Sequence, residues 1–380
     1  MVEMKSWHSV CAWTFHAGRG GFVPRHIRPS WEAPGFDTIA KIKLIRDKIV
    51  PRLPEHIQIG FEMHYDYEFN EDSADTIADA LVDAGIWLAM TSPGAHVHFG
   101  YGGIASLDPN ERLAALAYVR KTAELLCGPL HKAWHPDPEK APTLVIWNGS
   151  FGYDIATPAL REMYQNLKES VASLCHYGDS LNSGLYWAIE PKPNEGHPAM
   201  LLPTVASTIL FWKKLAEEFD LSLSNKGVNK EFGHSEMIGL DIIHDTIEEI
   251  DNDMLVHMHV NSQGYNDGII LGGPGKFDVD HGVRICGINI AVASLIEEAG
   301  YTRWKGHDIQ PRPYDKEEQA TDRVVRSILS WEACAKAAAE LDSERLMMLL
   351  TQRETAKAED LMREVVSIAQ RHFNVMYGIG

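Results

Sequence analysis

The stretch that decides the fold is residues 186–195, YWAIEPKPNE, in which an apolar run ends abruptly in charged residues. Proline fixes φ and cannot donate to a sheet ladder, so Pro191 and Pro193 stop a buried strand and stiffen the segment after it. Glu190 and Lys192 are then held in set directions at the end of that strand. The alternative is a strand end whose charges are simply solvated, and this stretch alone leaves both interpretations open.

A second stretch, residues 229–240, reads NKEFGHSEMIGL and lies where the next strand should end. The segment EPKPNE resembles the signature of the metal-dependent xylose isomerases, and residues 229–240 resemble the Asn-x-Glu-x-Gly-His-x-x-Met-x-Gly-Leu motif of the same family. Two such motifs in order are far more specific than one. The resemblance implies an α/β fold, a (β/α)8 TIM barrel that interconverts aldoses and ketoses, with its site at the C-terminal mouth of the strands.

Composition sets limits on the partners of the chain. With 380 residues, 45% of them hydrophobic, the chain is long enough for one barrel with an added tail. A formal net charge of −18 argues against nucleic acid or an anionic membrane as a partner, and it suits a site that gathers carboxylates around cations. The five cysteines include no CxxC pair, and we find neither a signal peptide nor a long apolar run. We therefore expect a cytoplasmic protein whose partner is a small-molecule sugar.

Hydrophobic patterning predicts eight strands, at residues 9–14, 57–66, 86–91, 143–147, 184–190, 221–225, 254–261 and 304–310. Helices are expected between them, at residues 37–50, 110–126, 161–177, 203–219 and 283–299. The proline-rich segment 128–142 is interpreted as a surface loop. Residues 1–320 would then form the barrel. Residues 321–380 resemble the C-terminal helical arm with which family members embrace a neighbouring subunit, which implies a homo-oligomer, a tetramer or a dimer.

The seventh predicted strand carries an unusual polar pattern. Its alternation aims His257, His259 and Asn261 to the same side, and unpaired polar groups in a core cost several kcal/mol. Xylose isomerases have aspartate at the position of His259, whereas the rhamnose isomerases and ketose 3-epimerases resemble this chain in having histidine. We therefore interpret His259 as a metal ligand.

The resemblance implies a first metal site made of Glu190, Glu231, His259 and Asp308. Carboxylate oxygens suit Mg²⁺, Mn²⁺ and Co²⁺, and the imidazole favours Mn²⁺ or Co²⁺. Glu231 and His234 lie three residues apart, so on a helical turn they share a face and could hold a second cation. The Asp-x-Asp that grips this second metal in the family is reduced here to Asp267, so we expect a weaker second site.

The catalytic residues implied by the resemblance are His64, Asp66 and Lys192. A carboxylate beside an imidazole fixes its tautomer and raises its basicity, which suits a group that moves the proton of an anomeric hydroxyl during ring opening. Lys192 would donate to the carbonyl oxygen as charge develops there. Trp13, Trp147, Lys192 and His234 would bind the sugar, and the indoles would keep water away while a hydride shifts between carbons.

Three alternatives remain. A ketose 3-epimerase, or a related enzyme of keto-sugars or sugar conjugates, would use two metal-bound carboxylates as acid and base; His259 favours it, although Asp308 stands where epimerases usually carry glutamate. An endonuclease of the same barrel class would need more clustered histidines and a basic groove. A non-catalytic sugar-binding barrel would not need several acidic ligands at one point.

Overall fold

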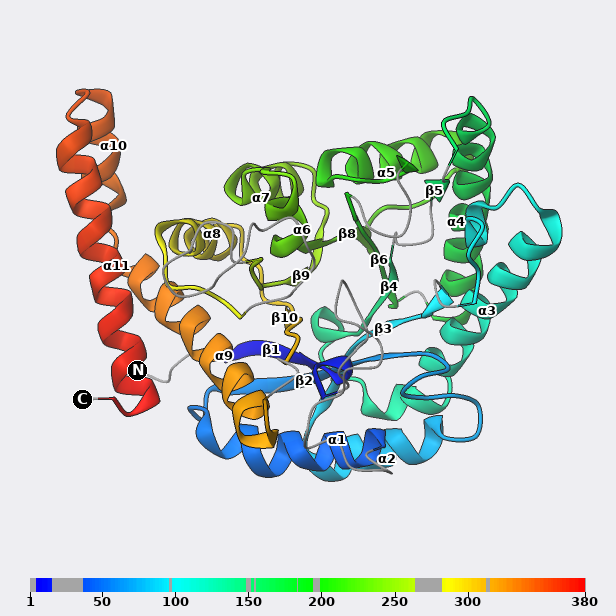
Figure 1. Ribbon diagram of the computed structural model, residues 1–380, viewed down its shortest axis with the longest axis horizontal. Helices are drawn as coiled ribbons and strands as arrows, with labels where there is room; N and C mark the ends of the chain where they lie inside the picture. The colour runs from blue at the N-terminus through cyan, green and yellow to red at the C-terminus, as the bar shows by residue number, and fades with distance from the viewer. Residues whose placement is uncertain are drawn as a thin grey trace.

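Eight parallel strands form a closed barrel that is surrounded by helices (Figure 1). The computed structural model describes residues 5–15, 37–95, 98–147, 152–153, 155–182, 184–193, 199–263, 282–311 and 315–379. The barrel strands are β1 (Ser6–Cys11), β2 (Ile57–His64), β3 (Trp87–Ser92), β4 (Thr143–Trp147), β6 (Tyr186–Glu190), β8 (Lys226–Glu231), β9 (Leu255–His259) and β10 (Lys305–His307). Their order around the barrel is β1-β10-β9-β8-β6-β4-β3-β2. The predicted (β/α)8 fold is confirmed.

Helices alternate with these strands and cover the outside of the barrel (Figure 1). They are α1 (Thr38–Leu44), α2 (Ala74–Ala84), α3 (Pro109–Cys127), α4 (Leu160–Leu181), α5 (Val205–Phe219), α6 (Phe232–Met237), α7 (Ile242–Asp251), α8 (Gly287–Glu298) and α9 (Glu317–Ala339). Local sequence fixes several starts: Asp108 accepts from Asn110 N ahead of a proline at the first helical position, and Thr204 forms a capping box with Ser207. A two-stranded antiparallel sheet, β5 (Gly152–Tyr153) with β7 (Ala199–Met200), lies outside the barrel strand order.

The sixth barrel strand differs from its prediction. Residues 221–225, LSLSN, alternate as a strand would, yet the strand is β8, which begins at Lys226 and includes Glu231 as its last residue. Every residue of β8 is buried although its sequence is KGVNKE, because its lysines have acidic partners. Lys226 Nζ lies 2.9 Å from Asp179 Oδ2, and Lys230 Nζ lies 2.8 Å from Glu249 Oε2. Pairing with residues far along the chain, which the pattern does not reveal, makes this polar segment a barrel strand.

The proline-rich segment 128–142 is not merely a surface loop. It contains two short 3-10 turns, Pro129–Ala133 and Pro138–Lys140, and Leu130 is fully buried. The His135 ring packs edge-on against Trp7 and Trp87, with ring centroids 4.8 and 4.7 Å away. Trp304 Nε1 donates to a carbonyl of this segment, that of Lys140. The segment therefore closes the N-terminal end of the barrel, opposite the predicted site.

The C-terminal helices divide at a different place from the predicted boundary. Helix α9 packs on β10 and α8 and buries Trp331, so it is the eighth helix of the barrel, and a boundary at residue 320 would cut through it. Helices α10 (Ser343–Thr351) and α11 (Thr355–Tyr377) follow. The later turns of α11 pack back on α9, whereas α10 and the start of α11 stand away from the barrel (Figure 1). The extension beyond the barrel thus begins after α9.

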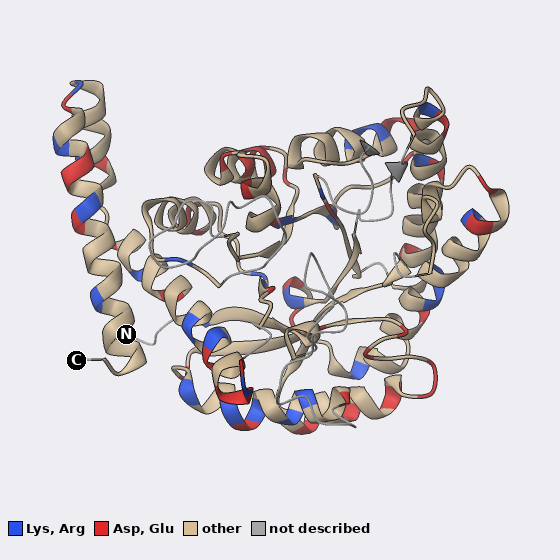
Figure 2. Ribbon diagram, in the orientation of Figure 1, with Lys and Arg blue, Asp and Glu red and all other residues tan. Residues whose placement is uncertain are grey.

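Charged residues of both signs are interspersed along α11, whereas the charged residues of α1 are lysines and those of α2 are aspartates (Figure 2). Among the described residues, no helix combines the length and the apolar character needed to cross a membrane.

Candidate active site

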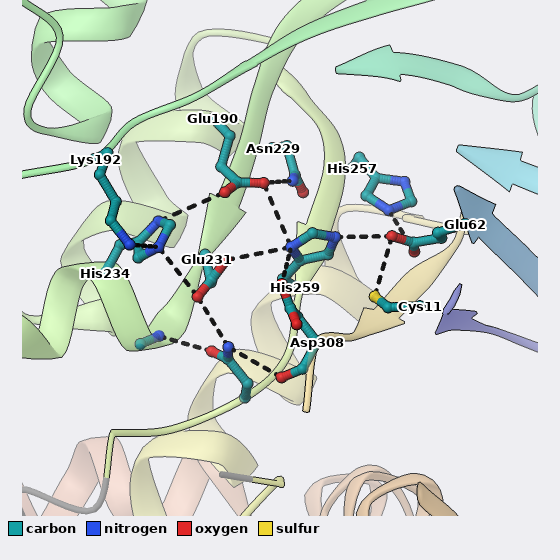
Figure 3. A network of polar contacts seen from close by, with 12 residues as sticks. Cys11, Glu62, Glu190, Lys192, Asn229, Glu231, His234, His257, His259 and Asp308 are labelled. Carbon is teal, nitrogen blue, oxygen red and sulfur yellow. Dashed lines mark hydrogen bonds and ion pairs between the residues drawn. The ribbon is translucent and has the colours of Figure 1, made fainter. Parts of the chain in front are cut away.

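Four polar side chains from four neighbouring strand ends converge at the C-terminal mouth of the barrel (Figure 3). Glu190, Glu231 and His259 are the last residues of β6, β8 and β9, and Asp308 directly follows β10. The Nδ1 atom of His259 lies 3.4 Å from Glu190 Oε2, 3.3 Å from Glu231 Oε2 and 3.9 Å from Asp308 Oδ2. One imidazole nitrogen therefore faces three carboxylates.

Burial and the nearby carboxylates shift the pKa values of the residues in this cluster. Burial raises the pKa of Glu190 well above its usual value, and the charge of Glu231 raises it further. Burial alone would lower the pKa of His259, but Glu62 and the surrounding carboxylates raise it well above its ordinary value. The buried cluster thus carries an excess of carboxylates that favours a bound positive charge.

The donor set fits a divalent cation. Adjacent ligands of a cation with bonds of roughly 2.1 Å lie roughly 3 Å apart, close to the separations around His259 Nδ1. Three carboxylates and one imidazole are hard or intermediate donors, which suits Mg²⁺, Mn²⁺ and Co²⁺. Two of the groups able to hold a metal are Glu190 with Glu231 and His234, and Glu231 with His259 and Asp308.

The second predicted site is centred on His234. Its Nε2 lies 3.2 Å from Glu231 Oε1 and 2.9 Å from Lys192 Nζ, while its Nδ1 lies 3.0 Å from the carbonyl oxygen of Pro191. The structure thus brings Glu231 and His234 together, across the junction of β8 and α6 instead of within one helical turn. Asp267 lies outside the described residues.

Lys192 lies between Pro191 and Pro193, directly after the end of β6. Its side chain is fully buried, and its Nζ lies 5.6 Å from the centre of the Trp147 ring, a cation–π contact. Trp147 is the last residue of β4. The predicted sugar-binding residues Lys192, His234 and Trp147 therefore form one wall beside the carboxylates.

Comparison with known proteins finds distant relatives of this chain. No protein-family model matches the chain. A curated relative, the xylose isomerase of Thermus caldophilus, is 27% identical over 231 residues, which cover 58% of this chain and 52% of the relative. The chain is therefore xylose isomerase-like, as a distant relative. The match spans only about half the length of that relative.

Solved structures share the barrel of this xylose isomerase-like chain. An L-ribulose 3-epimerase has a TM-score of 0.58 at 11% identity, covering 88% of this chain and 96% of its own. The D-allulose 3-epimerase from Methylomonas sp., solved with D-allulose, has a TM-score of 0.55 at 12% identity, covering 86% and 96%. The 3-keto-D-glucoside 4-epimerase from E. coli has a TM-score of 0.53 at 13% identity, covering 85% and 98%. At these identities the likeness concerns the fold.

Trp13 contacts a carboxylate of the cluster as well as lying beside it. It sits in the 3-10 turn Ala12–Phe15 after β1, and its Nε1 donates to Asp308 Oδ1 over 2.7 Å. Its ring centroid lies 4.3 Å from that of His64, the last residue of β2. Trp13 therefore connects the carboxylate cluster to His64.

The carboxylate beside His64 is Glu68 and not the predicted Asp66. Asp66 adopts a left-handed φ of 63°, which turns its exposed side chain toward His98 Nε2, 3.2 Å away. Glu68, four residues after His64, is buried, and its Oε2 lies 3.4 Å from His64 Nδ1 and accepts from His64 N. Burial would raise the pKa of Glu68, but His64 and Lys41 hold it at about 2. The sequence does place Glu68 four residues after His64, but Asp66, only two residues after the histidine, was the more obvious candidate.

Glu62 is a further site residue that the sequence did not single out. It lies on β2, is fully buried, and its Oε2 is 2.9 Å from His259 Nε2. Burial would raise its pKa, but His259 and His257 hold the pKa of Glu62 well below its usual value. Alternation along β2 aims Glu62 to the same side as His64, and this was the signal that could have found it.

Proposed function

We propose that the chain is a divalent-metal-dependent sugar isomerase that interconverts an aldose and a ketose. The observation that carries this proposal is the convergence of Glu190, Glu231 and Asp308 on His259 Nδ1 at the mouth of the barrel. The buried Lys192 and the His64–Glu68 pair would serve two different steps of the reaction. His64 would assist ring opening, and Lys192 would assist the chemistry at the carbonyl group.

Glu190, Glu231, His259 and Asp308 would hold the tight cation, Mn²⁺, Mg²⁺ or Co²⁺. Bound there, the cation would act as a Lewis acid that polarises the oxygens of the sugar. A weaker second cation would use Glu231 and His234, with Asp267 as a further ligand. Lys192 Nζ lies 2.9 Å from His234 Nε2 and so borders this second position.

The protein groups would then act on an open-chain sugar. His64, one-fifth exposed, would accept the proton of the ring hydroxyl while Glu68 holds its imidazole in place. Lys192 would donate a hydrogen bond to the carbonyl oxygen as negative charge develops on it. Hydrogen would pass with its electron pair from C2 to C1 of the aldose, while the proton on O2 moves to O1. Trp13 and Trp147 would keep water away from these carbons.

A second candidate function is epimerisation of a ketose or a related keto-sugar. It is favoured by the placement of Glu190 and Asp308, which approach His259 from two sides (Figure 3). Two carboxylates so placed could remove a proton from one face of a carbon next to a carbonyl and return one to the other face.

One experiment separates the two functions. The purified protein would be incubated in D₂O with aldoses and ketoses and with Mn²⁺, Mg²⁺ or Co²⁺, and the products would be separated by chromatography and analysed by NMR. An isomerase using hydride transfer should give aldose–ketose interconversion with little solvent deuterium on carbon. An epimerase should give a C-epimer labelled at the inverted carbon. Failure of the protein to bind any of these metals would contradict both functions.

We also propose a homo-oligomer, a dimer or a tetramer, assembled through α10 and the start of α11. Three large apolar residues of α10, Met347, Met348 and Leu350, are 63%, 50% and 47% exposed. An exposed apolar surface of this kind is typical of a protein interface. Met347→Glu with Met348→Glu should give a smaller species by light scattering while each chain keeps its fold. Unchanged assembly would contradict this role of the hairpin.

A further inference from the structure

Glu62 is fully buried and lies on the side of the His259 ring that faces away from the carboxylate cluster (Figure 3). Its Oε2 is 2.9 Å from His259 Nε2 and accepts from Cys11 Sγ over 3.4 Å. Its Oε1 accepts from Ser9 Oγ over 2.5 Å and lies 3.1 Å from His257 Nε2. The carboxylate is therefore fixed at both oxygens by residues of β1 and β9.

We propose that Glu62 is the positioning residue that orients the imidazole of His259, so that Nδ1 and not Nε2 is presented to the metal. This inference rests on the proposed metal-dependent function. An imidazole offers its two nitrogens in different directions, and the nitrogen that binds a metal is set by the partner of the other one. An ionised carboxylate only accepts hydrogen bonds, so Glu62 requires an N–H at His259 Nε2 and leaves Nδ1 for the cation.

Packing around the pair restricts the same ring. Gly306 on β10 faces Glu62 and His259, and a Cβ built on it would lie 2.5 Å from Glu62 Oε1 and 2.5 Å from His259 Cδ2. The absence of a side chain at Gly306 therefore gives the Glu62 carboxylate and the His259 ring the space to lie side by side. Rotation of the imidazole would need movement of Glu62, and Ser9 and His257 hold its other oxygen.

We expect this arrangement to increase the affinity of the site for its metal. A second-layer partner that fixes a metal-binding histidine typically accounts for roughly 10- to 100-fold in affinity, because the free ring would otherwise have to be ordered and given the right tautomer on binding. Glu62→Gln keeps the size of the side chain and one acceptor oxygen, but it removes the charge and offers an NH₂ to one of the two histidines. The variant should therefore fold while holding His259 less firmly.

The test is calorimetric titration of the full chain with Mn²⁺ for wild type, Glu62→Gln and Glu332→Gln. Glu332 is a matched control because it is also a buried carboxylate between two histidines, His8 and His56, but lies on α9 outside the barrel wall. We expect Mn²⁺ binding weakened roughly 10- to 100-fold in Glu62→Gln and unchanged in Glu332→Gln. A purely structural role would lower the melting temperature of both variants in EDTA and leave the Mn²⁺ affinity of both unchanged.

Several results would overturn the inference. Wild-type Mn²⁺ affinity in a folded Glu62→Gln protein contradicts it directly, as does equal weakening in the Glu332→Gln control. If Glu62→Gln does not fold, Ser9→Ala decides, because it removes one of the two partners of Glu62 Oε1 and leaves His257 as the other, without touching a ligand. It should weaken Mn²⁺ binding several-fold, and an unchanged affinity contradicts the inference. Absence of Mn²⁺, Mg²⁺ and Co²⁺ binding by wild type would instead refute the proposed metal-dependent function.

Discussion

Two buried glutamates, Glu62 and Glu332, each bridge a pair of histidines, but they lie on opposite sides of the barrel wall. Glu62 points into the barrel toward His257 and His259. Glu332, on α9, lies 2.8 Å from His8 Nε2 and 3.2 Å from His56 Nε2, between the helix and the strands. The local chemistry is nearly identical, so the surroundings must decide what each cluster does.

The surroundings shift the pKa values of His8 and His259 in opposite directions, whereas burial lowers the pKa of His257 as it does that of His8. Burial lowers the pKa of His8 to about 4, and it lowers the pKa of its neighbour His307 well below the usual value. Lys305 stands near both and adds to the effect. At His259, Glu62, Glu231 and Glu190 reverse the direction and raise the pKa. The outer cluster therefore disfavours protonation of His8 and His307, whereas the inner cluster favours protonation of His259.

The largest expected effect is the loss of the inner cluster's response to metal. Mn²⁺ at 100 times its dissociation constant should add about 2.7 kcal/mol to the unfolding free energy of wild type. Glu190→Gln removes one of three carboxylates and should abolish this gain and lower turnover by roughly 10³-fold, since metal binding contributes several kcal/mol to such reactions. Thermal melts with Mn²⁺ and with EDTA measure the gain. Glu332→Gln should keep it, and a Mn²⁺ shift retained by Glu190→Gln would contradict the ligand set.

The next effect is acid destabilisation through the outer cluster. His8 has a pKa of about 4 in the folded chain and about 6.5 when unfolded, so between these values the unfolded chain binds more protons. The unfolding free energy should therefore fall as pH decreases from 6.5 to 4, by roughly 3 kcal/mol from this group alone. The pKa of Glu332, held well below its usual value, adds a loss of the same sign at still lower pH.

Denaturant unfolding in EDTA at pH 4 to 7 measures this slope. His8→Gln stays neutral and can still donate to Glu332, so its curve should be flatter than that of wild type over the same range. His307, His56 and Lys305 also face the cluster and remain in the variant. Parallel curves for the two proteins would show that His8 is not the titrating group.

The sequence predicted the barrel because two of its motifs resemble those of the xylose isomerases and its hydrophobic pattern indicates eight strands. Glu190 and Glu231 could be placed at strand ends from their motifs, and His259 from the alternation of its strand, and the structure brings them together. The exact strand of Glu231 was wrong, because β8 is a polar segment whose lysines are neutralised by Asp179 and Glu249. Such partners lie far along the chain, and only tertiary structure brings them into contact.

The residues behind the site were harder to predict. Glu62 and Glu68 carry no motif of their own, and their importance comes from the imidazoles that they reach in space. The same holds for the segment 128–142, whose composition is that of a loop but whose His135 lies against Trp7 at the closed end of the barrel. A pattern along the chain identifies the groups that face the substrate more readily than the groups that hold them.

The smallest expected effect separates Glu68 from Asp66 as the support of His64. If His64 moves the proton of the ring hydroxyl, His64→Ala should slow turnover of pyranoses by roughly 10²-fold or more and affect an open-chain substrate much less. Glu68→Gln keeps the imidazole but loses the charge that orients it, so we expect a loss on the order of tenfold, again confined to the cyclic substrate. Asp66→Asn should leave both rates unchanged, because its carboxylate faces His98 and Tyr118. Steady-state rates on a pyranose and on an open-chain analogue decide the matter. A larger loss in Asp66→Asn than in Glu68→Gln would restore the sequence-based pairing, and equal losses on the two substrates would remove His64 from ring opening.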